Sequence, residues 1–128
     1  MKSKTNPLEE IGKFLLEIEK SEHIVRTVQH ITGRQLITTA DKLEESRSRK
    51  RPQVFARLQA MHFLRKHTTL TLDEIGVAVC PLKPFDHSTV IHAIQTAQDL
   101  IDTMEGREDF YKHYMMLQHF FNGSEILN

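Results

Sequence analysis

Two capped helices joined by a proline-containing turn form the most constraining feature of this sequence. Thr71 is followed three residues later by Glu74, which is the capping box of a helix start. Pro81 and Pro84 end this short helix and impose a turn, after which Asp86 can cap a second, longer helix. The expected buried positions are Leu72, Ile75 and Val79 in the first helix, and Val90, Ile94, Ala97, Ile101 and Met104 in the second.

Helical spacing of apolar residues also marks the rest of the chain. The longer helix is expected to end at Gly106, and Ser21 is expected to cap a helix of its own. The further expected helices cover residues 7–20, 21–33, a short stretch within 36–45, a segment with Pro52 in its first turn, and 108–121. Residues 68–72 alternate polar and apolar side chains as a strand does, but we favour a loop leading into the capping box. The sequence therefore predicts an all-α, multi-helix domain of about six or seven helices that contains a helix-turn-helix.

Positive charge is concentrated in one segment although the chain as a whole has a net charge of zero. Seven Lys and Arg residues and no Asp or Glu lie between Arg47 and His67, so this segment carries +7 and the rest of the chain −7. A phosphate backbone responds to the local field on one face rather than to the total charge. The alternative is that the segment is simply a solvated loop.

The start of the longer helix has the side chains expected of a DNA-contacting helix. In a helix-turn-helix, the N-terminal turn of the second helix points into the major groove. His87, Ser88 and Thr89 place small hydrogen-bonding groups there, and Asp86 caps the free N–H groups of the helix. Any pair of well-capped helices would share part of this pattern, so the pattern alone leaves the function open.

These segments resemble a known family. The run Leu72–Gly76 (Leu-Asp-Glu-Ile-Gly) and the run Asp86–Ala93 (Asp-His-Ser-Thr-Val-Ile-His-Ala) resemble the C-terminal DNA-binding domain of the bacterial replication initiator DnaA. Arg57–Leu64 looks like the helix of that family with an Arg-Gln-x-Ala-Met-x-Leu pattern, preceded by its basic loop. The resemblance implies an extra N-terminal helix over residues 1–22, a Trp-repressor-like DNA-binding domain over residues 23–121 and a tail over residues 122–128.

The resemblance also implies roles for individual residues. His87, Ser88 and Thr89 would contact bases and phosphates in the major groove, and Arg57 would enter the neighbouring minor groove. The residues of the basic loop would lie along the phosphates. The full set of candidate DNA-binding residues is Arg47, Arg49, Lys50, Arg51, Arg57, Lys83, Asp86, His87, Ser88, Thr89 and His92.

The sequence departs from the family pattern in two places. The turn Cys80–Phe85 is longer than the Gly-Gly-Arg-like turn of the family, and Phe85 stands where a base-contacting arginine would be. Phe cannot replace an arginine that binds guanine with two hydrogen bonds, although Lys83 can contact phosphate. The sequence also has no Gly-rich loop with Lys-Ser/Thr, so we expect no nucleotide binding and no ATPase domain.

Catalytic and metal-binding functions have little support. The eight histidines include the pairs His62 with His67 and His87 with His92, whose spacing of five does not share a helical face well. No His-Glu-x-x-His or Cys-x-x-Cys motif occurs, and the lone Cys80 is expected to be a small packing residue. We therefore expect a non-enzyme without cofactor or metal.

Two functional hypotheses follow from the sequence. The first is a sequence-specific double-stranded DNA-binding protein that acts in replication control, at an origin, or in transcription regulation. The second is a protein–protein interaction module that kept the fold and lost DNA binding, and that uses the N-terminal helix or the aromatic and Met-rich segment 111–121. A homodimer is considered in either case. The polar residues 1–6 and the absence of a long apolar run lead us to expect a cytoplasmic protein that does not enter a membrane.

Overall fold

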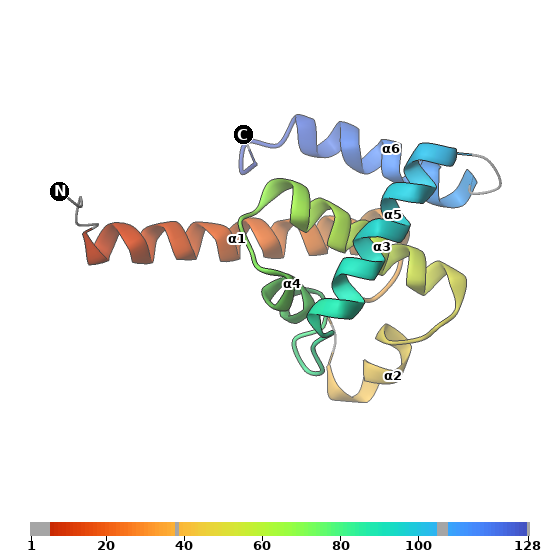
Figure 1. Ribbon diagram of the computed structural model, residues 1–128, viewed down its shortest axis with the longest axis horizontal. Helices are drawn as coiled ribbons and strands as arrows, with labels where there is room; N and C mark the ends of the chain where they lie inside the picture. Colours follow the sequence, from red (N-terminus) through yellow and green to blue (C-terminus); the bar gives the residue numbers. More distant parts are fainter. Residues whose placement is uncertain (1–5, 38, 105–107, 128) are drawn as a thin grey trace.

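The chain folds into six α-helices and one short 3₁₀ helix, with no strand in the part that the structure describes (Figure 1). The computed structural model describes residues 6–37, 39–104 and 108–127. The helices are α1 (Pro7–Thr32), η1 (Ala40–Lys42), α2 (Leu43–Ser46), α3 (Arg51–His67), α4 (Leu72–Val79), α5 (His87–Thr103) and α6 (Glu108–Asn122). The all-α prediction and the predicted number of helices are confirmed. No helix among these residues is both long and apolar enough to cross a membrane.

Helix α3 lies at the centre of the fold and packs against α1, α4 and α5. Phe63 and Leu64 of α3 are fully buried. The last helix, α6, covers this core with Phe110, Leu117 and Phe121, which are buried at helical spacing. The buried Gln59 of α3 donates a hydrogen bond from Nε2 to the Phe110 carbonyl oxygen at 2.8 Å, which fixes the start of α6 to the core.

The N-terminal helix is one continuous element, so the prediction of two helices separated at Ser21 is wrong. Asn6 caps its start, where its side chain accepts from the Leu8 N–H at 2.9 Å, and Gly33 ends it in the left-handed conformation, with φ of 70°. The Ser21 hydroxyl does not cap a helix but donates to the Ile18 carbonyl oxygen at 2.8 Å within the same helix. A serine can satisfy its hydroxyl in this way without interrupting the helix.

Two other boundaries differ from the prediction. The helical stretch expected within residues 36–45 starts only at Ala40, as a 3₁₀ turn that leads into α2. Met104 was expected on the buried line of α5, but it lies past the helix end with φ of 58° and is 51% exposed. Gly106, the expected end of this helix, lies outside the described residues.

Candidate nucleic-acid interface

The predicted helix-turn-helix is present as α4, a turn over residues 80–86, and α5. Thr71 and Glu74 form the predicted capping box, with hydrogen bonds of 3.2 Å to the Glu74 N–H and 2.9 Å from the Thr71 N–H. The Asp86 side chain accepts from the Thr89 N–H at 2.8 Å and caps α5. This backbone hydrogen bond, with a further one from the Thr89 side chain, lowers the pKa of Asp86 below its ordinary value. The cap is therefore strongest when Asp86 is ionised.

A close backbone contact fixes the angle between α4 and the start of α5. Gly76 of α4 faces the backbone of Phe85, and a Cβ at this glycine would lie 2.0 Å from the Phe85 carbonyl oxygen and 2.9 Å from its carbonyl carbon. Any side chain here would push the turn away, because the atoms in its way belong to the backbone. The Glu-Ile-Gly run therefore has a structural function in docking the two helices.

Phe85 is a packing residue rather than a DNA-facing one. Its side chain is 9% exposed and belongs to the hydrophobic core. The guanidinium carbon of Arg47 lies 4.1 Å from the centroid of its ring, and that of Arg57 lies 5.5 Å from it. The aromatic ring therefore gathers two arginines from distant parts of the chain beside the start of α5. The sequence comparison treated Phe85 only as a lost arginine and missed this role.

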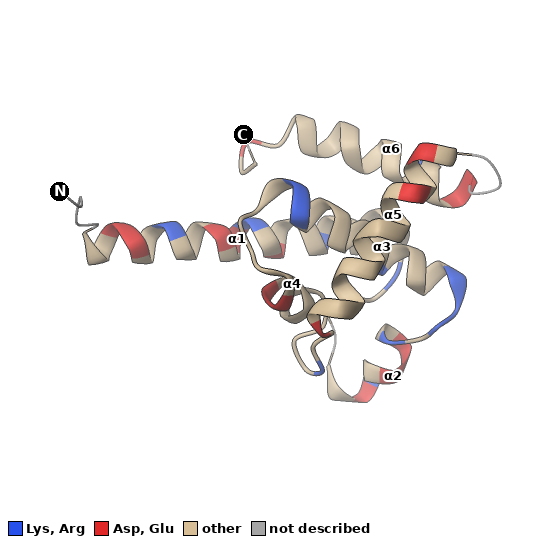
Figure 2. Ribbon diagram, in the orientation of Figure 1, with Lys and Arg blue, Asp and Glu red and all other residues tan. Residues whose placement is uncertain are grey.

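Arg47 connects the basic loop to the turn of the helix-turn-helix. Its Nη1 donates to the Lys83 carbonyl oxygen at 2.6 Å while the guanidinium lies over Phe85. Figure 2 shows basic residues in the loop that leads into α3 and at the tip of the turn between α4 and α5. Because Arg47 bridges these two segments, they form one surface next to the start of α5.

Arg57 holds the basic loop from the side of α3. Its Nη1 donates to the carbonyl oxygens of Ser46 at 2.9 Å and Ser48 at 2.8 Å. Burial, and secondarily the charge of Arg47, lowers the pKa of this guanidinium. Arg57 is thus a half-buried brace in the unbound chain, and its predicted contact with the minor groove stays a prediction.

The remaining candidate residues lie on the surface of the same region. Lys83 is exposed in the turn, Arg49 and Lys50 are exposed in the loop, and Arg51 is the exposed first residue of α3. On α5, the exposed candidates are His87, Ser88, Thr89 and His92. His87 Nδ1 lies 3.6 Å from Asp73 Oδ1, a contact that joins the first turns of α4 and α5.

The sequence analysis missed two exposed residues on this helix. Ile91 is 43% exposed and Gln95 is exposed, and both follow Ser88 on one helical face, at steps of three and seven residues. The helical repeat that marked the buried face of α5 would have found them, had it been applied to the opposite face as well.

The described residues contain no group of three or more His, Cys, Asp or Glu side chains placed to hold a metal ion. Cys80 is 1% exposed, and its Sγ lies 4.0 Å from the Ser46 hydroxyl. This burial agrees with the packing role predicted for Cys80.

Residues 25–97 match the family model described as the bacterial dnaA protein helix-turn-helix. The match covers more than half of the chain: it starts within α1, includes α3 and α4, and ends within α5. The resemblance found in the sequence was expected to extend to Phe121, so α6 lies outside the matched region. No match was found among solved structures.

Proposed function

The chain belongs to the bacterial DnaA helix-turn-helix family, which is a DNA-binding rather than a catalytic family, and on this premise we propose that it binds double-stranded DNA sequence-specifically. The start of α5 enters the major groove. The observation that carries the proposal is the exposed first turn of α5, which is capped by Asp86 and flanked by the basic surface that Arg47 and Phe85 hold together.

The base contacts come from the exposed face of α5. Ser88 and Thr89 can donate to or accept from base edges, and the Gln95 amide can pair with adenine through two hydrogen bonds. Ile91 offers an apolar side chain of the kind that packs on a thymine methyl group. Because Phe85 is turned into the protein, the preferred site differs from that of a relative with an arginine at this position.

The phosphate contacts come from Arg49, Lys50, Arg51 and Lys83, whose side chains are exposed. Arg47 and Arg57 act mainly as positioning residues, because their guanidinium groups are engaged with carbonyl oxygens of the loop and the turn. This division predicts that the exposed group sets the salt dependence and that the positioning pair sets the shape of the surface.

At the cellular level we propose a role at the bacterial chromosome, in the control of replication initiation or of transcription. Such a protein would act in the cytoplasm, at the nucleoid. A DNA-binding domain that occupies sites of the initiator without hydrolysing ATP would compete with initiation, whereas occupation of promoter sites would regulate transcription.

Selection from a randomised duplex library, followed by affinity measurements at two salt concentrations, tests this function. We expect an enriched consensus and a steep loss of affinity with salt, of about 0.9 in the logarithmic slope for each phosphate contacted. Lys50→Ala is expected to weaken binding to all sequences, and Gln95→Ala to relax the preference for one base pair. Lys112→Ala, an exposed cation on α6, is the matched control and should change nothing.

Absence of binding to any duplex at low salt would overturn the proposal. It would favour the second candidate, a protein-interaction module, for which α6 offers the exposed apolar residues Met115, Met116 and Phe120. Binding without an enriched consensus would overturn the sequence-specific part.

A further inference from the structure

We propose that the first half of α1 is a dimerisation arm, which in solution lies in the groove between α1 and α4 of a second copy of this chain. This inference concerns a surface away from the helix-turn-helix and does not depend on DNA binding.

The arm is a free helical segment. Every residue from Pro7 to Leu16 is exposed, and Figure 1 shows this part of α1 extending beyond the other helices. Contact with the body of the domain begins at Glu17, whose Oε2 accepts from the Thr69 N–H at 2.9 Å. Five large apolar side chains on this segment are 45–76% exposed, namely Leu8, Ile11, Phe14, Leu15 and Leu16.

The apolar surface of the arm is wider than a single contact requires. At the helical repeat, Glu9, Glu10, Lys13 and Glu17 fall within about 100° of the circumference, and the apolar residues and Gly12 span roughly 200°. Five half-exposed side chains expose on the order of 400–500 Å², as much as the largest patch on a typical monomer. A face of this width can pack against two surfaces at once.

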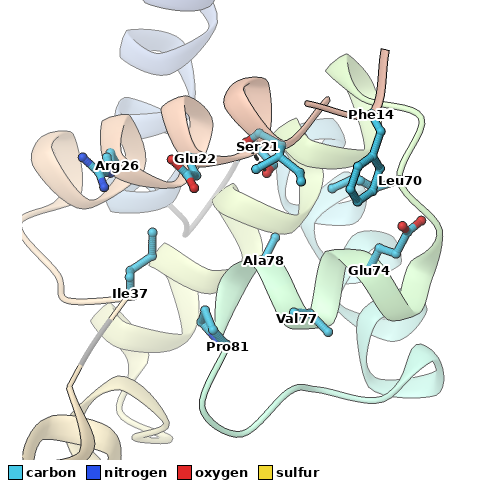
Figure 3. A pocket seen from close by; sticks show the side chains of 11 residues that line it. Phe14, Ser21, Glu22, Arg26, Ile37, Leu70, Glu74, Val77, Ala78 and Pro81 are labelled. Atoms are coloured by element: carbon cyan, nitrogen blue, oxygen red, sulfur yellow. Dashed lines mark hydrogen bonds between the residues drawn. The ribbon is translucent and has the colours of Figure 1, made fainter. Parts of the chain in front are cut away.

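A groove of matching character lies beside the arm. It has a volume of about 390 Å³ and runs between α1 and α4 (Figure 3). Its apolar lining comes from Phe14, Ile18, Ile37, Leu70, Val77 and Pro81. Glu22 and Arg26 also line it, and Figure 3 shows them on the α1 side, opposite the side chains of α4.

The arm cannot fill the groove of its own molecule, because it continues without a break into the helix that forms one wall of that groove. A second copy can supply it, and the reverse contact then forms by two-fold symmetry. Each arm would meet α1 of the partner on one side and α4 of the partner on the other, which accounts for the width of its apolar face. Two such contacts bury about 1,000 Å² or more in total, which reaches the size of a specific interface.

The charges of arm and groove are complementary in one antiparallel register. The step from Glu9 to Lys13 equals the step from Glu22 to Arg26, so an antiparallel partner brings Lys13 opposite Glu22 and Glu9 opposite Arg26 at the same time. A parallel pairing would not bring both ion pairs together. The charges therefore favour a second copy with antiparallel arms.

Sedimentation velocity of the full chain, from about 1 to about 100 µM, tests the proposal. We expect a monomer–dimer equilibrium in the wild type, and at least tenfold weaker association in Ile11→Glu and in Leu15→Glu. Both side chains are exposed, so the variants should keep the far-UV circular dichroism and melting behaviour of the monomer. Met116→Glu, which changes an equally exposed apolar residue on α6, is the matched control and should dimerise as the wild type does.

A charge exchange tests the partner and the register. Lys13→Glu should weaken the dimer severalfold, and the double variant Lys13→Glu/Glu22→Lys should restore it. A wild type that stays monomeric at all these concentrations, or a dimer that is unaffected by Ile11→Glu, overturns the proposal. Absence of rescue by the double variant overturns the antiparallel arrangement.

The two proposals can fail separately. Ile11→Glu should still bind a duplex with a single site, because α5 and the basic surface are unchanged, and should lose only the gain from two linked sites. A monomeric wild type that binds DNA refutes the arm alone, and a dimer without DNA affinity refutes the proposed function alone.

Discussion

Replacement of Phe85 by alanine is expected to destabilise the whole domain, not only a DNA contact. The ring is 9% exposed, is part of the hydrophobic core and lies beneath the Arg47 guanidinium at 4.1 Å. Removal of a buried phenylalanine side chain costs about 3–5 kcal/mol, because burial is lost and a cavity remains. The lost contact with Arg47 contributes about 0.5–1 kcal/mol of this.

Urea unfolding followed by far-UV circular dichroism measures this loss. A domain of this size has a slope of about 1–3 kcal/mol per molar urea, so the midpoint should fall by about 2 M. Phe85→Leu is the control that keeps the apolar volume and removes the aromatic face, and it should lose less than about 1.5 kcal/mol. A cycle of Phe85→Leu with Arg47→Met then isolates the coupling between ring and guanidinium, which we expect to be about 0.5–1 kcal/mol.

The opposite result would refute this account of Phe85. If Phe85→Ala unfolds within about 0.5 kcal/mol of the wild type and yet binds DNA more weakly, the ring faces the DNA and does not pack in the core. A coupling of zero in the cycle would remove the proposed role in gathering the arginines.

Three further predictions concern the fold that carries the interface. Gly76→Ala should cost about 1–3 kcal/mol in thermal unfolding, because its Cβ would lie 2.0 Å from the Phe85 carbonyl oxygen, whereas the exposed Val77→Ala should stay within about 0.5 kcal/mol; equal losses would contradict the close contact. Thr71→Ala removes the capping box and should lower stability by about 1 kcal/mol, an effect that Thr71→Ser should largely avoid. Burial lowers the pKa of His62 to about 4 from 6.5, so the unfolded chain binds the extra proton between these values. The free energy of unfolding should therefore fall by ~1–3 kcal/mol as the pH drops from 6.5 to about 4, and His62→Gln should flatten this dependence.

The helices nearest to the interface were predictable because their signals are local. Thr71 and Glu74 satisfy each other within one turn, and Asp86 caps a helix whose first residue follows it directly. Such contacts depend on residues a few positions apart, so the sequence contains all that is needed to place them. The start of α4 and the start of α5 are therefore where the sequence put them.

The parts that were not predictable depend on contacts across the chain. Ser21 can cap a helix or bond within one, and the choice depends on how α1 packs against α3 and α6. The role of Phe85 depends on Arg47 and Arg57, which come from a loop and a helix far earlier in the sequence. Local patterns do not show such partners, so the sequence alone suggested a lost function where the structure has a new packing contact.

The turn between α4 and α5 separates its length from the position of the helix it feeds. Its two ends, Cys80 and Phe85, are buried, whereas all the residues between them, Pro81–Pro84, are exposed. The additional residues thus bulge outward between two fixed anchors and leave the docking angle of α5 unchanged. For protein engineering, this exposed tip is a natural insertion site, where added groups would reach toward neighbouring DNA while the recognition helix keeps its orientation.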